Sequence, residues 1–235
     1  MSRVVTQVLV MATILVCGEW TLAQDDDALG ALLALLDEKA AKITDLSATF
    51  TQEKHTAILR RPLVSSGTVR VRPPLVRWDT DRPHASKMLV SQKEVRIFYP
   101  DQATVEIYDL AGQLGQLAAS PIFRLAALRE HFRIERAAPR KGEKPVAGRV
   151  ELRLAPRAQA LRDHIQEIRL SVDEDSSLVR RAEVINSDGE RTVMTFDHIK
   201  VNPGLVPGAL ALEIPPGTNI VRPLEPDPGK RGDGP

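Results

Sequence analysis

The fold of this chain is decided by residues 67–79, which read Gly67-Thr68-Val69-Arg70-Val71-Arg72-Pro73-Pro74-Leu75-Val76-Arg77-Trp78-Asp79. Apolar and polar residues alternate on both sides of the Pro-Pro pair, which predicts two β-strands joined by a tight turn. If the turn leaves this alternation unbroken, Arg72, Val76 and Trp78 lie on one side of the hairpin. The stretch therefore predicts a β-rich fold whose strands each bury one side.

The same alternation recurs along most of the chain, and turn-forming residues separate one alternating stretch from the next. Asn186-Ser187-Asp188-Gly189 and Asn202-Pro203-Gly204 are two of these turns. Short consecutive strands joined in this way form an antiparallel meander. Further alternating stretches are Val95/Ile97/Tyr99, Val105/Ile107, Val150/Leu152/Leu154 and Ile168/Leu170/Val172.

Two helices are expected beside these strands. Asp25-Asp26-Asp27 precedes apolar residues spaced by three and four from Leu29 to Ile43, which predicts a helix with one apolar stripe. Ser120-Pro121 provides a cap and a first-turn proline for the segment Ile122 to Leu128, which is apolar except for Arg124. We expect this short helix to be almost wholly buried.

These elements predict an α+β fold, in which a strongly curved antiparallel sheet forms an incomplete β-barrel. The N-terminal helix and the short apolar helix are expected on its concave face. One face of such a sheet must be covered, and few elements are present to cover it. An incompletely filled concavity is therefore expected.

The chain ends differ from this domain. Residues 1–23 combine Arg3, an apolar run and Thr21-Leu22-Ala23, which predicts a cleavable secretory signal peptide. Residues 24–221 are expected to form one domain, and the Pro- and Gly-rich residues 222–235 a flexible tail. An alternative is lipidation of Cys17, which would anchor the protein, although Val16 is larger than the residue such a site prefers.

Composition excludes several classes of function. Lys and Arg number 32 against 31 Asp and Glu, so the chain has no basic excess for nucleic acid. Its five histidines are scattered, and we expect no metal site and no cofactor. No nucleophile-elbow, dinucleotide or phosphate-loop motif occurs, so we expect no catalytic residue and no enzyme. Cleavage after Ala23 would remove the only cysteine, which excludes disulfides.

The order of these pieces resembles the LolA family of periplasmic outer-membrane lipoprotein carriers. The resemblance rests on the residue 67–79 hairpin and on motifs spread along the chain. The motifs are Phe50-Thr51-Gln52, Leu89-Val90-Ser91, Val95 to Pro100, Asp109-Leu110, Ser120-Pro121 with its apolar helix, Leu152 to Pro156, Asp188-Gly189 with Thr192 and Phe196, and Leu212 to Gly217.

The resemblance implies roles for individual residues. Arg72 falls at the position where a guanidinium latches the lid helices by hydrogen bonds to backbone carbonyls, which its five donors suit. From the residues alone, Arg72 is better read as a solvated strand end, and Trp78 is read equally well as ordinary core. The lid helix is assigned to Ile122, Phe123, Leu125, Ala126 and Leu128, and the lipid-binding cavity to Phe50, Val76, Trp78, Leu89, Ile97, Tyr99, Ile107, Leu152 and Leu154.

Energetics restrict how such a carrier works. Burying an acyl chain yields about 0.8 kcal/mol per CH₂, so several chains would be held too tightly for release. We therefore expect the lid helix to fill the groove when cargo is absent and to compete with it. The segment from Ile122 to Leu128 is the expected competitor.

The expected function is that of a monomeric periplasmic chaperone for acylated lipoproteins or other acyl lipids. The resemblance implies an inner-membrane ABC-type exporter as donor and an outer-membrane acceptor. Two alternatives share the fold: a periplasmic lipid-binding sensor of envelope stress, and a membrane-anchored lipoprotein acceptor that would need Cys17 lipidated.

Overall fold

The computed structural model describes residues 19–109, 125–140 and 142–223. These residues build one sheet of 12 strands in the order β12-β6-β5-β4-β3-β2-β1-β11-β10-β9-β8-β7. The strands are β1 (Leu46–His55), β2 (Leu63–Arg72), β3 (Leu75–Arg82), β4 (Ser86–Val90), β5 (Glu94–Tyr99), β6 (Thr104–Asp109), β7 (Phe132–Arg136), β8 (Arg149–Pro156), β9 (Ile165–Asp173), β10 (Val179–Asn186), β11 (Arg191–Val201) and β12 (Asn219–Val221).

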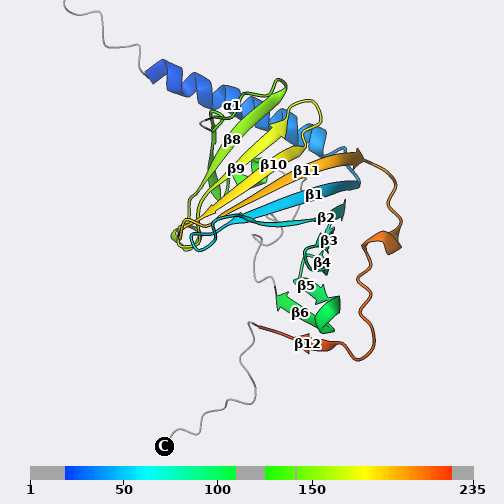
Figure 1. Ribbon diagram of the computed structural model, residues 1–235. Helices are drawn as coiled ribbons and strands as arrows, with labels where there is room; N and C mark the ends of the chain where they lie inside the picture. The colour runs from blue at the N-terminus through cyan, green and yellow to red at the C-terminus, as the bar shows by residue number, and fades with distance from the viewer. Residues whose placement is uncertain (1–18, 110–124, 141, 224–235) are drawn as a thin grey trace, which may run out of the picture.

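Neighbouring strands pair antiparallel, except that β12 pairs parallel with β6. The sheet curves strongly but stays open, because its two ends carry β12 and β7 as different edges. Figure 1 shows the strands fanning from β7 and β8 round to β6 and β12. The predicted fold class, a curved antiparallel sheet with an N-terminal helix, is confirmed.

The described residues contain few helices. The longest is α1 (Glu19–Ala40), followed by α3 (Leu125–Leu128), α4 (Gln159–Arg162) and the short 3-10 helices η1 (Pro100–Gln102) and η2 (Pro207–Leu210). Figure 1 shows α1 running across the half of the sheet that contains β8–β11. No helix in the described ranges has the length and apolarity to cross a membrane.

The main core lies between the concave face of the sheet and the helices α1 and α3. Leu33 and Leu36 of α1 and Leu125 and Leu128 of α3 are buried against inward side chains of the sheet. Period-two alternation supplies those side chains, as in β8, where every second residue from Val150 is buried. The apolar stripe predicted from Leu29 to Ile43 is thus the packed side of α1, which ends at Ala40.

A second, smaller core lies on the convex face. Phe98, Val105 and Ile107 pack there against Leu212 and Ile214. Leu212 and Ile214 belong to the segment between β11 and β12, which passes over β2–β6 before β12 joins the edge (Figure 1). This covering segment, residues 202–218, was not predicted.

Gly67 lies on β2 at a close approach to the backbone of β3. It pairs with Phe50 of β1, and the register of β2 against β3 shifts between Ser66 and Gly67. A Cβ atom at this position would lie 1.9 Å from the backbone oxygen of Asp79. Only glycine lets the strands approach this closely.

Both chain ends extend beyond the described residues. The helix α1 begins at Glu19, before the cleavage point predicted after Ala23, and the processing of residues 1–23 stays a prediction. The tail predicted for residues 222–235 lies outside the described residues from position 224 onward.

Candidate functional site

The centre of the concave face is an aromatic cluster contributed by β1, β3 and β11. The rings of Phe50 and Trp78 meet edge to face, with centroids 4.8 Å apart and planes at 74°. Phe196 lies 5.9 Å from Trp78. Strand pairing brings the three together, because Phe50 pairs directly with Phe196 and the neighbouring β2 pairs with β3. All three side chains are buried.

Five leucines cover this floor: Leu29, Leu33, Leu36, Leu125 and Leu128. Complete burial of a leucine side chain is worth about 1.5–3 kcal/mol, so the cover contributes about 8–15 kcal/mol of gross apolar stabilisation. The helix α3 has only four residues and cannot be stable alone. Its position therefore depends on contacts with α1 and the sheet.

A hydrogen bond joins the two covering helices. The backbone N–H of Leu125, at the start of α3, donates to Oδ1 of Asp37 on α1 over 2.6 Å. A carboxylate is a strong acceptor for an otherwise unpaired N–H at a helix start. Sequence reasoning missed Asp37, because its partner is 88 residues away and no local pattern indicates the contact.

Most of the predicted cavity residues lie on the concave face. Phe50, Val76, Trp78, Leu152 and Leu154 are buried in the main core. Ile97 lies on the same face, because Met88 pairs with both Ile97 and Trp78. Tyr99 follows Ile97 at period two and is half-buried.

Two of the predicted cavity residues lie on the opposite face. Leu89 pairs with Arg77 and Arg96, on the side away from Trp78. Ile107 also pairs with Arg96 and belongs to the convex core. The structure thus corrects their placement: the alternation was assigned to the wrong face at β4 and β6, because a single strand's pattern does not say which face is concave.

The lid segment is only partly described. Leu125 and Leu128 are buried in the main core, and their role as a lid stays a prediction. Ile122 and Phe123 lie outside the described residues, and so does the side chain of Ala126.

Arg72 lies on the other side of the sheet from Trp78, which corrects the parity predicted for the hairpin. The two-residue turn pairs Arg72 with Leu75 and Val71 with Val76, so Val71 shares the face of Trp78. Arg72 is exposed and donates from Nη1 to the backbone oxygen of Leu205 over 3.0 Å. This hydrogen bond thus connects Arg72 to the 202–218 segment.

A second arginine, missed by sequence reasoning, holds the same segment. Arg77 is only 5% exposed, and its Nη1 donates to the backbone oxygen of Ala211 over 2.9 Å. Its Nε and Nη2 donate to Oδ1 of Asp79 over 2.8 and 2.7 Å. The alternating Arg70, Arg77 and Asp79 mark a polar strand face, but the carbonyl partner lies 134 residues away.

A polar group closes the β5–β6 end of the concave face. Glu106 accepts hydrogen bonds from the hydroxyls of Tyr108, over 2.8 Å, and Tyr99, over 3.3 Å. The bond to Glu106 raises the pKa of Tyr108 to about 12. Burial, and then the charge of Glu106, raise the pKa of Tyr99. Both phenols are therefore neutral donors at physiological pH.

Buried side chains fill the space between the concave face and the helices α1 and α3. Apolar side chains dominate it, and the described residues contain no cluster of His, Cys, Asp and Glu that could hold a metal ion. What the arrangement provides is an apolar floor under a cover made of separate helices.

Comparison with known proteins agrees with this geometry. The family model "Outer membrane lipoprotein carrier protein LolA" matches residues 41–209. The chain belongs to the LolA family. Its relatives include the outer-membrane lipoprotein carrier protein of Pseudomonas aeruginosa, which is 27% identical over 206 residues and aligns with 83% of this chain and 94% of its own length. The carrier of the same name from Azotobacter vinelandii is 26% identical over 201 residues, covering 84% of this LolA-family chain and 89% of its own.

A solved structure shares the fold of this LolA-family protein. An uncharacterized conserved protein of Thermus thermophilus superposes with a TM-score of 0.51 at 14% identity, covering 83% of this chain and 99% of that one. At this identity the likeness concerns the fold alone.

Proposed function

We propose that this protein is a periplasmic carrier that binds the acyl chains of lipoproteins between the concave face of its sheet and the helices α1 and α3. It performs no covalent chemistry and acts as a monomer. The observation that supports this most directly is the construction of the main core, in which one side is the sheet and the other is two helices tied to each other through Asp37 and Leu125. Family membership supplies the cargo class.

The energetics allow exchange between cover and cargo. The five covering leucines contribute about 8–15 kcal/mol of gross apolar stabilisation. At about 0.8 kcal/mol per CH₂, the same amount corresponds to about 10–19 methylenes of an acyl chain. Displacing the helices thus loses about as much burial as one acyl chain gains. For one acyl chain, net affinity is therefore a small difference, which permits release.

In this proposal, cargo comes from an inner-membrane ABC-type exporter and passes to an outer-membrane acceptor. The predicted signal peptide supports a periplasmic location. The latch role implied for Arg72 is kept as a proposal, and its bond to Leu205 suggests that it acts through the 202–218 segment.

Site-specific photocrosslinking in the periplasm tests the proposal. A photoreactive residue in place of Val76, on the concave face, should capture acylated lipoproteins, identified by mass spectrometry of the adduct. The matched control replaces Leu89, on the neighbouring strand but the opposite face, and should capture none. Capture of free lipids alone from position 76 would favour the sensor function, and equal lipoprotein capture from both positions would contradict the groove.

A further inference from the structure

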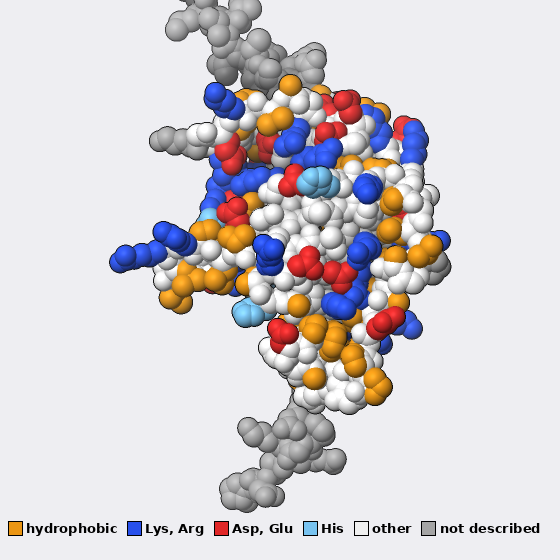
Figure 2. Space-filling view, turned by 45° about the vertical axis from the view of Figure 1, so that its right-hand side comes forward, with side chains coloured by type: hydrophobic (Ala, Val, Ile, Leu, Met, Phe, Trp, Pro, Cys, Tyr) orange, Lys and Arg blue, Asp and Glu red, His pale blue; other side chains and the backbone are white. Residues whose placement is uncertain are grey.

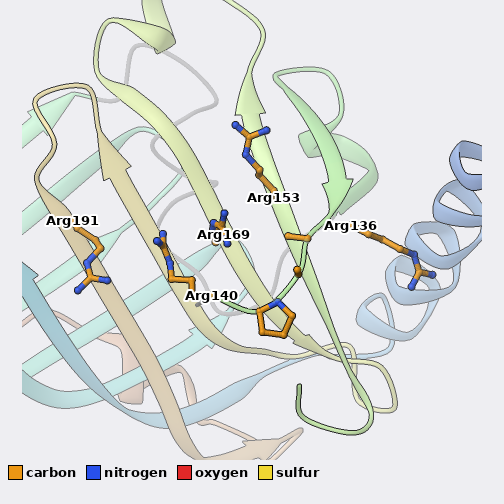
Figure 3. A pocket seen from close by; sticks show the side chains of 8 residues that line it. Arg136, Arg140, Arg153, Arg169 and Arg191 are labelled. Atoms are coloured by element: carbon orange, nitrogen blue, oxygen red, sulfur yellow. The ribbon is translucent and has the colours of Figure 1, made fainter. Parts of the chain in front are cut away.

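The convex face over β8–β11 carries a cavity of about 640 Å³ that the carrier function does not use. Arg153 of β8, Arg169 of β9 and Arg191 of β11 line it from the sheet, and Arg140 lines it from the loop after β7 (Figure 3). Arg136 also lines the cavity, but its side chain points away from the other four arginines (Figure 3). Four guanidinium groups from four separate segments therefore converge on one cavity.

The surface in Figure 2 provides a comparison for this cavity. Figure 2 shows Lys and Arg side chains interspersed with Asp and Glu over the face that it presents. The lining of the cavity, by contrast, contains five arginines and no acidic residue.

Two glutamates lie beneath these arginines. Glu183, which is fully buried, accepts hydrogen bonds from Nε of Arg140 over 2.8 Å and from Nη1 of Arg191 over 3.3 Å. Glu167 accepts from Nε of Arg153 over 2.6 Å and from Nε of Arg169 over 2.8 Å. The glutamates hold the guanidinium groups in place from below.

The cavity keeps an excess of positive charge. The charged cluster is larger than these six residues, because Arg153 also pairs with Glu135 and Arg181 also pairs with Glu183. Arg133 and Glu143 pair with the same two added residues. Six arginines against four glutamates leave two positive charges.

The net charge of two is that of the cluster at neutral pH. Burial of Glu167 opposes its ionisation, but the hydrogen bonds from Arg153 and Arg169 outweigh burial and lower its pKa. The arginines are always charged.

Donor groups remain for a ligand. Nη2 of Arg140 is buried and has no hydrogen-bond partner among the described residues, and it lies 3.9 Å from Oε1 of Glu167. Arg169 contacts its glutamate through Nε, and no hydrogen bond within the described chain uses its two terminal nitrogens. Arg153 and Arg169 face each other directly in the strand register, and Glu167 bridges their Nε atoms.

We propose that this cavity binds a dianionic phosphate group. Guanidinium groups present planar pairs of N–H donors that match phosphate oxygens, and two positive charges balance a phosphate dianion. A single carboxylate, with two oxygens and one charge, would leave donors and charge unmatched. The site lies on the opposite face of the sheet from the aromatic cluster, so it is independent of the proposed acyl groove.

Titration with inorganic phosphate and pyrophosphate, at constant ionic strength in chloride buffer, tests the site. The Nε–H resonances of Arg140, Arg153 and Arg169 in the wild-type protein should shift saturably, while that of Arg96 should not. Arg96 is a matched control, because it also lies on the convex face and bonds to a glutamate, Glu94, outside the cavity.

Variants measure each contribution. Arg140→Gln and Arg169→Gln should each weaken phosphate binding about tenfold, the loss expected for a charge-assisted contact, and Arg96→Gln should leave it unchanged. No saturable shift in the wild-type protein, or equal affinity in Arg140→Gln, would overturn the proposal. The wild-type resonances decide the matter even if a variant fails to fold.

Vesicles identify the source of the phosphate. Phosphatidylcholine vesicles with phosphatidic acid should bind the wild-type protein more tightly than Arg140→Gln if the ligand is a lipid headgroup. Phosphate binding in solution without this difference would assign the site to a free phosphate compound. If an acidic peptide such as oligoglutamate competed more strongly than pyrophosphate, the phosphate assignment would be wrong.

Discussion

Shortening Leu128 to alanine should tighten the binding of an acyl chain while destabilising the empty protein. The side chain of Leu128 is 2% exposed and packs into the main core from α3. Replacing a buried leucine by alanine costs at least about 2 kcal/mol, and we take about 2–3 kcal/mol for this four-residue helix. If α3 leaves the groove before an acyl chain enters, this cost falls on the closed state alone.

The size of the effect follows from that loss. A penalty of about 2–3 kcal/mol on the closed state raises the open fraction by about 30- to 150-fold. Since apparent affinity is proportional to the open fraction, the Kd of an acyl ligand should fall by up to the same factor. The gain ends once the open state predominates.

The assay is titration with a polarity-sensitive fluorescent fatty acid, combined with thermal unfolding. Leu178→Ala is the matched control, because Leu178 is also 2% exposed in the main core but lies in the turn between β9 and β10. It should lower the unfolding temperature and leave the Kd unchanged. If Leu128→Ala instead weakens fatty-acid binding or leaves it unchanged, α3 does not compete with cargo and the reasoning fails.

Three further outcomes are expected. Arg72→Leu removes one exposed hydrogen bond and should lower the stability by at most about 1 kcal/mol. Cargo transfer in a reconstituted assay should nevertheless fall. Unchanged transfer would remove the latch assignment. Gly67→Ala should lower stability by about 2 kcal/mol or more in urea unfolding, since its Cβ would collide with the Asp79 backbone, whereas Gly208→Ala, with open space around it, should be nearly neutral. The arginine partners of Glu167 lower its pKa from the ordinary 4.5. Its contribution to stability is therefore present above about pH 4.5 and is lost as the pH falls through the pKa of the folded state. Glu167→Gln should reduce the loss of stability at acid pH, and an unchanged pH dependence would contradict this contribution.

The curved sheet could be predicted because the signals for it are local. The alternation around Val69 and Val71, and in β8 from Val150, records which residues face a core, and turn residues mark where strands end. The apolar stripe of α1 likewise requires no knowledge of its partner. Each of these signals lies within one element of the chain.

What failed or was missed depends on contacts between distant elements. Arg72 was placed on the wrong side because turn length, and not alternation alone, sets the face on which a hairpin residue lies. The convex core needs Leu212 and Ile214 to return across the sheet, and the Asp37 bond to Leu125 spans 88 residues. None of these partners has a local sequence signal.

Hydrogen exchange at the Leu125 amide tests the central claim most directly, because this N–H is the one bonded to Asp37 across the two covering helices. The account predicts slow exchange in the empty protein and markedly faster exchange when an acylated lipoprotein is bound, as α3 leaves the groove. Equal protection of this amide in the empty and the loaded protein would show that the cover stays in place, and would contradict the account.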